Sequence, residues 1–373
     1  MIKRIINILA VSLPALLLLT GWGSVGHSKI SYNSTIFFHA DMAQFAVAWR
    51  SGLTSHASDA DSRKSSDPTE DVKHFIDIDD YQEFNSTGMI AQDYTTIVSQ
   101  HGSSFVQNTG ILPWATITTF DSLKSQLSRR DFNKALLTAA DLGHYVGDGY
   151  MPLHITKNYD GKLTGQSGIH SRYESTMISK YQNSFIFTAD TISYISNVSG
   201  YVFSYIYTNY KYCDSLFKAE TAAYNAASSR SSDAYYLALW NNTGVFTNRL
   251  FNGAAKSLAA LIYTAWTDAG RPQLTTDFSE RLTSAITGFE VYQNYPNPFN
   301  PETVITFSLP YSSDISVSVF DLKGKEISII KNSFMSAGLH SVKFNASDLA
   351  GGIYYYQVSA GNRQITKKMA LIK

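Results

Sequence analysis

The side chains best suited to chemistry in this sequence are histidines that stand at regular distances from carboxylates. His144 and Asp148 are four residues apart, as are His170 and Glu174, and His154 lies between the two pairs. Because residues four apart share one face of a helix, each pair could present a nitrogen and a carboxylate oxygen to one ion. One such pair is more often an ordinary surface contact. Two pairs with a histidine between them predict a bound metal, and these ligands suit Zn²⁺ where thiolates are absent.

Three segments further upstream carry the same kinds of side chain. His74 begins the sequence His-Phe-Ile-Asp-Ile-Asp, Asp61 stands in a stretch rich in Asp and Ser, and His27 ends the sequence Trp22-Gly-Ser-Val-Gly-His. The chain has a single cysteine, Cys213, which excludes an intramolecular disulfide and a metal site made of several thiolates. Stability must therefore come from core packing or from a metal held by histidines and carboxylates.

The elements that position these side chains are predicted to be helices. Residues 132–150 have apolar side chains at helical spacing, with Asp131 available as an N-cap. Residues 232–266 show the same spacing and predict one interrupted helix or two successive helices, which end at Gly270-Arg-Pro. The pattern from residue 22 to about residue 270 therefore indicates a mainly helical domain.

The last part of the chain has a different pattern. Short β-branched or aromatic runs alternate with polar residues, at 303–309, 315–320, 326–331, 341–344, 353–358 and 364–371. Turn residues separate them about every ten positions, which is typical of a small β-sandwich. Three prolines within 294–301 predict a stiff extended linker or a first edge strand between the two parts.

The N-terminus has the layout of a targeting segment. Lys3 and Arg4 precede an apolar run over 5–19, and Thr20 and Gly21 end it with small residues. This layout predicts a secretory signal peptide over 1–21, because the run is too short and too interrupted by proline to span a bilayer comfortably. A buried core helix is the alternative. We expect an exported, soluble mature protein.

Composition limits the classes that remain. The 373 residues are enough for about two domains, and Lys plus Arg equals Asp plus Glu at 30 each. Only 16% of residues are charged, while Tyr and Phe number 24 and 21. Such a chain is too aromatic and too weakly charged to be disordered. It also lacks the basic stripe expected of a protein that holds a nucleic-acid backbone by charge.

The tail resembles the C-terminal sorting domain of the type IX secretion system. The resemblance rests on the Tyr-Gln-Asn-Tyr-Pro-Asn-Pro-Phe-Asn-Pro entry at 292–301, on strand motifs at 319–324 and 349–355, and on the paired lysines at 367–368. It implies a sorting domain over 287–373, a secreted or cell-surface location, and the type IX secretion machinery as a partner. A general sandwich module for adhesion or spacing is the alternative.

The histidine motifs resemble the zinc-dependent phospholipase C and S-one/P-one nuclease superfamily. The matching stretches are 144–148, 152–154 and 168–174, and both the opening at 22–27 and the segment at 74–77 fit the same family. The resemblance implies a mainly α-helical catalytic domain over 22–286, followed by the small all-β sandwich domain over 287–373.

That resemblance further implies three zinc ions held by residues from the whole set of motifs. The expected metal ligands are Trp22, His27, Asp61, His74, His144, Asp148, His154, His170 and Glu174. The first ion would lie among Asp61, His74, His144 and Asp148, and the second among His154, His170 and Glu174. The third would be bound by the α-amino group and carbonyl of Trp22, by His27 and by Asp148. Asp148 would thus bridge two ions, and Asp61 and Asp148 are the expected catalytic residues. Asp59 and Asp67 are nearby alternatives to Asp61.

The expected reaction is hydrolysis of a phosphodiester by metal-activated hydroxide. No Gly-x-Ser-x-Gly sequence supports a serine nucleophile. A phospholipase C acting on phospholipids, with contact to a membrane surface, is favoured by Glu rather than Asp at 174 and by the short interval from His154 to His170. A nuclease or 3′-nucleotidase acting on single-stranded nucleic acid is favoured by the compact opening from Trp22 to His27. A non-catalytic surface binding protein stabilised by metal is the third alternative.

Overall fold

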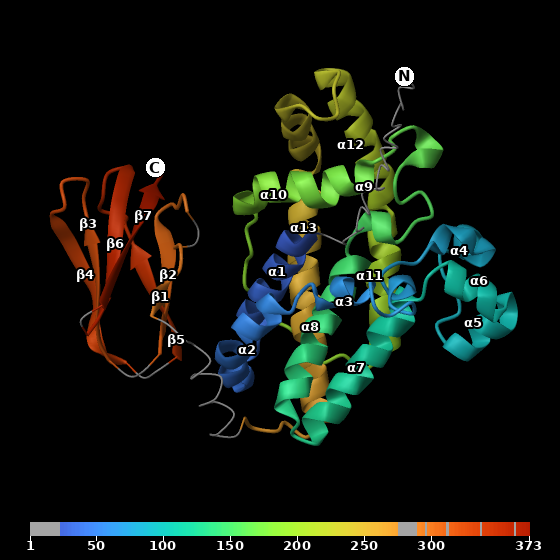
Figure 1. The fold of residues 1–373 in the computed structure, drawn as a ribbon, viewed down its shortest axis with the longest axis horizontal. Coiled ribbons are helices and arrows are strands. Elements are labelled where there is room, and N and C mark those ends of the chain that lie inside the picture. Colours follow the sequence, from blue (N-terminus) through green and yellow to red (C-terminus); the bar gives the residue numbers. More distant parts are fainter. Residues whose placement is uncertain (1–22, 275–288, 295–296, 311–312, 336–337, 362) are drawn as a thin grey trace, which may run out of the picture.

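The computed structural model describes residues 23–274, 289–294, 297–310, 313–335, 338–361 and 363–373 (Figure 1). The expected signal peptide (1–21), the expected ligand Trp22 and the expected domain boundary at 286/287 lie outside these residues. The described residues form a helical region followed by an antiparallel β region, as the sequence predicted. No helix within the described ranges has the length and apolar character needed to cross a membrane.

The helical region contains long helices that form its body and short ones that connect them. In chain order they are α1 (Gly23–Ser34), α2 (Ala43–Ser55), α3 (Asp59–Arg63), α4 (Gln82–Thr87), α5 (Tyr94–His101), α6 (Ser103–Asn108), α7 (Leu112–Ser128), α8 (Phe132–Gly149), α9 (Ile169–Ser171), α10 (Ile178–Tyr181), α11 (Val198–Tyr210), α12 (Tyr212–Ala227) and α13 (Asp233–Asp268). A π-helical turn over Arg172–Met177 joins α9 to α10.

Helix α8 is the central element of this region. It begins after Asp131, whose side chain accepts the N–H of Lys134, so the predicted N-cap is confirmed. Helices α1, α2, α7 and α13 all pack against α8, and its C-terminal half from Leu142 to Gly149 is entirely buried. The two site residues of this helix are therefore carried by the most enclosed backbone of the region.

Helix α13 corrects one expectation from the sequence. It runs without interruption over 36 residues, whereas the pattern predicted an interrupted helix or two helices. Gly253, which weakens the helical pattern, leaves room for Tyr150, because a Cβ at this position would lie 2.5 Å from the tyrosine ring. The glycine therefore allows close packing and does not end the helix. The predicted stop is confirmed, since Gly270 follows the helix with a φ of +82°.

An extended segment over 185–197 runs along α13 and is held by its side chains. The Asn248 side chain accepts the N–H of Ile186 at 3.0 Å, and Asn252, one turn later, accepts the N–H of Thr188 at 3.1 Å. Two asparagine side chains four residues apart on α13 thus accept hydrogen bonds from backbone N–H groups of a segment that belongs to no helix or strand. This arrangement was not predicted from the local pattern of residues.

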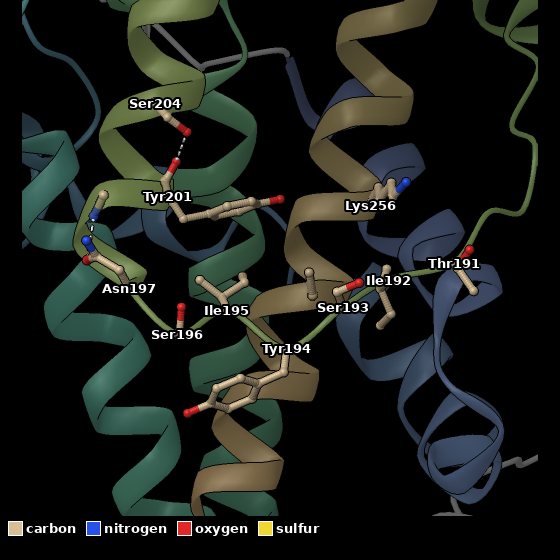
Figure 2. Close-up of a pocket in the computed structure, with 12 residues that line it drawn as sticks. Thr191, Ile192, Ser193, Tyr194, Ile195, Ser196, Asn197, Tyr201, Ser204 and Lys256 are labelled. Atoms are coloured by element: carbon tan, nitrogen blue, oxygen red, sulfur yellow. Dashed lines mark hydrogen bonds between the residues drawn. The ribbon is translucent and has the colours of Figure 1, made fainter.

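A hollow of about 540 Å³ lies between this extended segment, the start of α11 and α13 (Figure 2). Lys256 is the only charged side chain among the described residues that line it, and neither a histidine nor a carboxylate is present there. This hollow therefore lacks the side chains that would bind a metal.

The β region is a two-sheet sandwich of antiparallel strands. One sheet has the order β1-β2-β5 and the other β4-β3-β6-β7. The strands are β1 (Glu290–Val291), β2 (Glu302–Leu309), β3 (Ser313–Phe320), β4 (Glu326–Met335), β5 (Gly338–Asn345), β6 (Gly352–Ala360) and β7 (Arg363–Leu371). Each of the six runs expected from the sequence overlaps one strand from β2 to β7, and alternate side chains such as Val317 and Val319 are fully buried.

Candidate metal centre

Eight of the nine expected metal ligands lie within the described residues, and the fold brings them together. His27 comes from α1, Asp61 from α3, His144 and Asp148 from α8, and Glu174 from the π-helical turn. His74 and His154 lie at the ends of short 3-10 turns, and His170 lies in α9. Every one of the eight is buried, with no more than 7% of its surface exposed. Charged and ionisable groups are rarely so enclosed unless they are paired or bind a metal.

Asp148 lies at the middle of this cluster. Its Oδ1 is 3.5 Å from Nε2 of His27 and 3.3 Å from Nδ1 of His154. Its Oδ2 is 3.0 Å from Nδ1 of His74 and 3.4 Å from Nε2 of His144. One carboxylate thus faces four imidazoles, two from each of its oxygens, which is the placement needed for a bridging ligand.

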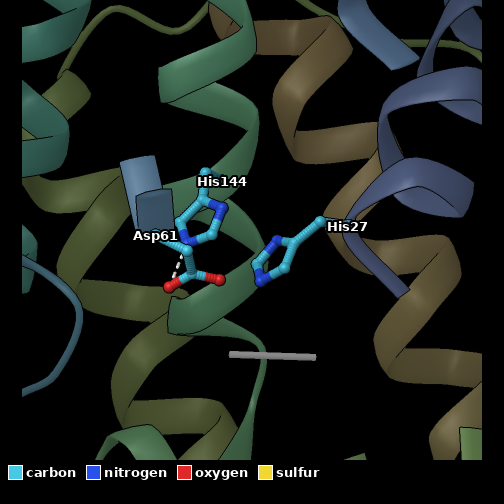
Figure 3. Close-up of side chains that lie close together, drawn as sticks. All are labelled: His27, Asp61 and His144. Atoms are coloured by element: carbon cyan, nitrogen blue, oxygen red, sulfur yellow. Dashed lines mark ion pairs between the residues drawn. The ribbon is translucent and has the colours of Figure 1, made fainter. Parts of the chain in front are cut away.

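Asp61 lies beside the same histidines. Its Oδ1 is 3.5 Å from Nε2 of His144 and 3.6 Å from Nδ1 of His74. Figure 3 shows His27, Asp61 and His144 pointing toward one another, with the rings of the two histidines stacked at 3.8 Å. The ligand atoms of these three residues all lie within 4.8 Å of one another, so they form one possible metal-binding group.

The two alternatives to Asp61 lie outside the cluster. Asp59 pairs with His56 at 2.6 Å, and both side chains are more than 40% exposed. Asp67 accepts hydrogen bonds from the backbone and hydroxyl of Thr69. Of the three aspartates, Asp61 alone is brought to the histidines, and it also pairs with Lys64 at 2.9 Å.

A second group is formed by His154, His170 and Glu174, whose ligand atoms again lie within 4.8 Å of one another. Oε2 of Glu174 is 3.1 Å from Nε2 of His170 and 3.4 Å from Nε2 of His154. Glu174 belongs to the π-helical turn, a widened form of helix that is frequent at functional sites. The spacing of four residues that suggested this pair from the sequence thus places the two side chains together.

Backbone carbonyl groups fix the orientation of two of the rings. The carbonyl of Ala57 accepts a hydrogen bond from Nδ1 of His144 at 2.8 Å, and the carbonyl of His74 accepts one from Nδ1 of His154 at 2.7 Å. With the proton on Nδ1, the lone pair of each ring is on Nε2. Both Nε2 atoms face the carboxylates of the cluster, so these rings are oriented as metal ligands are.

Neighbouring charges alter the pKa values of the cluster. Burial, and then the adjacent His144, lower the pKa of His27 to about 3. Burial opposes the charged form of His144, but Asp148 and Asp61 raise its pKa to about 9. Burial likewise opposes the charged form of Asp148, yet His144 and His154 hold its pKa below the ordinary value. The carboxylates are therefore ionised at neutral pH and stabilise positive charge among the rings.

The donor atoms fit a metal such as zinc. Both ring nitrogens of His27 and of His170, and Nε2 of His154, make no hydrogen bond within the described ranges although they are buried. A buried polar atom without a partner costs about 1–3 kcal/mol, so a set of them in one place requires a compensating ligand. Imidazole nitrogens and carboxylate oxygens are the ligands that zinc takes in catalytic sites.

Gly23, the first residue that the structure describes, lies close to the second group. A Cβ built on Gly23 would be 3.4 Å from the Ser175 hydroxyl and 3.7 Å from the carbonyl oxygen of Glu174. Helix α1 therefore begins beside the π-helical turn. The expected ligand Trp22, which precedes Gly23, lies outside the described residues.

One residue of the site was not identified from the sequence. Glu70 is 1% exposed, and Oε1 of this residue is 3.5 Å from Nε2 of His74. It stands four residues before His74, the same spacing that drew attention to the other histidines. The four-residue spacing could therefore have identified Glu70, although in this pair the acid precedes the histidine.

A larger cavity of about 840 Å³ is lined by residues that adjoin this cluster, among them Tyr145, Lys73, Trp114 and Tyr94. The Tyr145 ring is 5.5 Å from that of His74. Tyr145 therefore borders the cavity and also contacts a candidate metal ligand.

The chain thus combines a helical domain that gathers buried metal-ligand side chains with a β-sandwich. Residues 293–373 match the family described as the secretion system C-terminal sorting domain. The resemblance predicted for the tail is therefore confirmed. The chain is secreted or placed on the cell surface by type IX secretion, and the sandwich interacts with that machinery.

Among solved structures, the chain is similar to the alpha toxin from Clostridium absonum. That match has 14% identity and a TM-score of 0.43, and covers 96% of this chain and 100% of the toxin chain. The alpha-toxin of Clostridium perfringens from an avian strain matches with 11% identity and a TM-score of 0.42, over 94% and 97% of the two chains. Curated protein sequences give no significant match. The function of the helical domain is therefore inferred from its own side chains.

Proposed function

We propose that the protein is a secreted zinc-dependent hydrolase of phosphodiesters, most similar in activity to phospholipase C. The observation that carries the proposal is the position of Asp148 between two sets of buried ligands. A carboxylate shared in this way suits a cluster of ions, whereas a purely structural zinc site needs only four closed ligands. The sorting domain supports a site of action outside the cell.

Zinc ions bound in this cluster would supply Lewis acidity, which activates water and stabilises the charge that develops on a phosphoryl group. The chain itself supplies the geometry. The carbonyl groups of Ala57 and His74 hold two imidazoles with Nε2 toward the site. Both carboxylate oxygens of Asp61 are buried, and Oδ1 faces His144 and His74, so this carboxylate is placed to accept a proton from a water held within the site.

The loop beside the second group favours a lipid as substrate. The ring of Tyr159 is 5.7 Å from that of His170, and the side chain of Tyr159 is 38% exposed. Leu163, in the same loop, is 68% exposed. Exposed apolar side chains next to a catalytic site suit a substrate presented in a membrane surface, and we propose a phospholipid for this reason.

A nuclease or 3′-nucleotidase is the second candidate. The observation in its favour is again Tyr159, because an exposed aromatic ring beside the site could stack on a base. Zinc-loaded mature protein should be assayed side by side on phosphatidylcholine vesicles, single-stranded DNA and 3′-nucleotides. We expect release of the phosphorylated headgroup from the vesicles. Faster turnover of DNA would select the nuclease, and no turnover of any substrate would favour the metal-stabilised binding protein.

We further propose that the α-amino group of Trp22 is a zinc ligand. The amine must then be free, because a peptide nitrogen has no basic lone pair. Protein from the native host should begin Trp-Gly-Ser-Val, and a recombinant form beginning Met-Trp should bind less zinc than the native form. An extended form that binds as much zinc and turns over normally would leave Trp22 without this role.

A further inference from the structure

Glu70 is a buried carboxylate that contacts groups from the three segments that carry Asp61, His74 and His144. Its partners are the side chains of Arg63, Lys73, His74 and Tyr145. We propose that Glu70 is a positioning residue, which orients His74 toward the metal and fixes the segments that carry Asp61 and His144. The inference rests on the metal centre of the proposed function and adds a residue outside the set of ligands.

The orientation of the His74 ring is shown by the groups that its two nitrogens face. Nε2 faces Oε1 of Glu70 at 3.5 Å, while Nδ1 is 3.0 Å from Oδ2 of Asp148 and 3.0 Å from Nε2 of His144. A neutral imidazole carries one proton. At 3.5 Å the contact between Nε2 and Oε1 is an ion-pair distance without a hydrogen bond. The anion of Glu70 on this side favours the proton on Nε2, which leaves the lone pair of Nδ1 directed into the cluster. Carboxylates behind metal-binding histidines act in this way and raise the basicity of the ligand.

The second contact reaches α3. Nη2 of Arg63 is 3.3 Å from Oε1 of Glu70, and Nη1 of the same guanidinium is 3.0 Å from Oδ1 of Asp141. Arg63 stands two residues after Asp61 in α3, and Asp141 stands three residues before His144 in α8. The guanidinium thus links Glu70 to α3, which carries Asp61, and to α8, which carries His144.

The third contact reaches α8 directly. The hydroxyl of Tyr145 donates a hydrogen bond to Oε1 of Glu70, and Tyr145 is the neighbour of His144 in the chain. Lys73 completes the set by donating to Oε2 at 2.8 Å. Two cations and a hydroxyl therefore compensate for the burial of the anion, which would be costly if it stood alone.

The chain offers a matched control in Glu220. This carboxylate is fully buried and also has two cations and a phenol as partners, with Arg172 at 3.2 Å, Arg230 at 2.6 Å and the Tyr235 hydroxyl at 3.1 Å. No expected ligand histidine is among these partners, although Arg172 begins the π-helical turn that carries Glu174. Replacing Glu220 therefore removes a buried charge of the same kind beside the second group and leaves the contacts of His74 unchanged.

The test compares Glu70→Gln with Glu220→Gln in the full mature chain, without any substrate. Each protein is loaded with zinc, dialysed against a graded series of chelator concentrations, and analysed for bound zinc and for its melting temperature. We expect Glu70→Gln to bind its most weakly held zinc about 10–100-fold less tightly than the wild type. We expect Glu220→Gln to lose melting temperature and to weaken zinc binding by less than Glu70→Gln does, because it leaves the support of His74 in place.

Cobalt-substituted protein provides a readout that general destabilisation would not change. The visible spectrum of bound Co²⁺ should shift more in Glu70→Gln than in Glu220→Gln. Tyr145→Phe removes one hydrogen bond to Glu70, so it should also weaken zinc binding. We expect a decrease of about 3–10-fold, which is smaller than the effect of Glu70→Gln because Glu70 itself remains. This variant also serves if Glu70→Gln does not fold.

Two results would overturn the inference. Equal zinc affinity and an unchanged cobalt spectrum in Glu70→Gln or Tyr145→Phe would make Glu70 a structural residue only. Equal zinc loss in the two glutamine variants would show that the effect follows stability. A wild type that binds zinc but hydrolyses no phosphodiester would contradict the proposed function and leave this inference standing.

Discussion

The two regions of the molecule treat buried polar groups in different ways. In the sandwich, the buried side chain of Asn294 donates to Thr303 at 2.9 Å, and the hydroxyl of Tyr356 accepts the N–H of Asn294 and donates to the carbonyl of Tyr292. Within the described part of 289–373, every buried side-chain nitrogen or oxygen has a hydrogen-bond partner. In the helical region, buried atoms without one are concentrated among the expected metal ligands, as in His27 and His170.

The difference indicates what each region is for. Hydrogen bonds within the described part of the sandwich satisfy its buried side chains. The candidate metal centre collects carboxylates and imidazoles whose free atoms point at one another, which is unfavourable without a cation. Unsatisfied buried groups therefore mark the region for which we propose a bound cation, and the following predictions test this contrast.

Removal of metal should have the largest effect, and it should act on one region only. All five tryptophans, at 22, 49, 114, 240 and 266, precede the sandwich, so tryptophan fluorescence reports on the helical region alone. Dialysis against EDTA should abolish hydrolysis. It should also lower the fluorescence melting temperature by about 5–10 °C, since a ligand at 100 times its Kd contributes about 2.7 kcal/mol and 1 kcal/mol shifts such a domain by about 2–4 °C.

Added Zn²⁺ should restore both properties, and Mg²⁺ serves as the control ion. Strand signals from the sandwich, followed by infrared amide bands, should not change on chelation. Full activity in metal-free protein would contradict the mechanism.

The second prediction compares two carboxylates of the metal centre. Asp148→Asn should reduce hydrolysis by at least about 100-fold, because Lewis acidity contributes several kcal/mol and 1.36 kcal/mol is tenfold in rate. Asp61→Asn should be less damaging, since Asp148 faces four imidazoles and Asp61 faces two. Mass spectrometry of the native protein should show more than one zinc lost in the first variant.

Asp93→Asn is the control for the change in charge. Asp93 caps α5 at an exposed position, and asparagine is an equally good N-cap. Equal zinc losses in Asp148→Asn and Asp61→Asn would show that Asp148 does not bridge two ions.

The third prediction concerns Asp77, three residues after His74. Burial, and then the nearby Asp79 and Asp80, raise the pKa of Asp77 to about 7. Between about pH 4 and pH 7 the folded chain therefore binds more protons at this position than the unfolded chain, and stability falls as the pH rises. Asp77→Asn should melt about 2–4 °C above the wild type at pH 8 and equally at pH 4.

Asp121→Asn is the comparison for removal of one exposed carboxylate, which in Asp121 lies beside Lys124. A wild-type pH profile retained in Asp77→Asn would assign the effect to other groups.

Removal of the sandwich should have the smallest effect on the rate of hydrolysis. A chain that ends near Leu282 should keep its turnover and its tryptophan melting temperature, because no expected ligand lies beyond Glu174. In the native host the shortened protein should remain in the periplasm, since the sorting domain has been removed. A loss of turnover without unfolding would give the sandwich a part in catalysis.

Most of the fold and the site could be predicted from the sequence because the signals are local. Apolar periodicity identified α8 and the six longer strands, and spacings of four residues identified the pairs in α8 and in the π-helical turn. The interruption predicted for α13 was wrong, because the effect of Gly253 depends on Tyr150, about a hundred residues away. The role of Trp22 and the chain boundaries at 21 and 286 stay predictions.

The sequence by itself determined the types of ligand and the helices and strands that carry them, since these depend on neighbours within a few residues. Tertiary structure decided which aspartate joins the histidines, with Asp61 inside the cluster and Asp59 paired at the surface. It also placed the carbonyl of Ala57 against His144, 87 positions away, and brought Tyr145 to Glu70, 75 positions away. Such contacts depend on how distant segments pack, and no spacing along the chain encodes that distance in space.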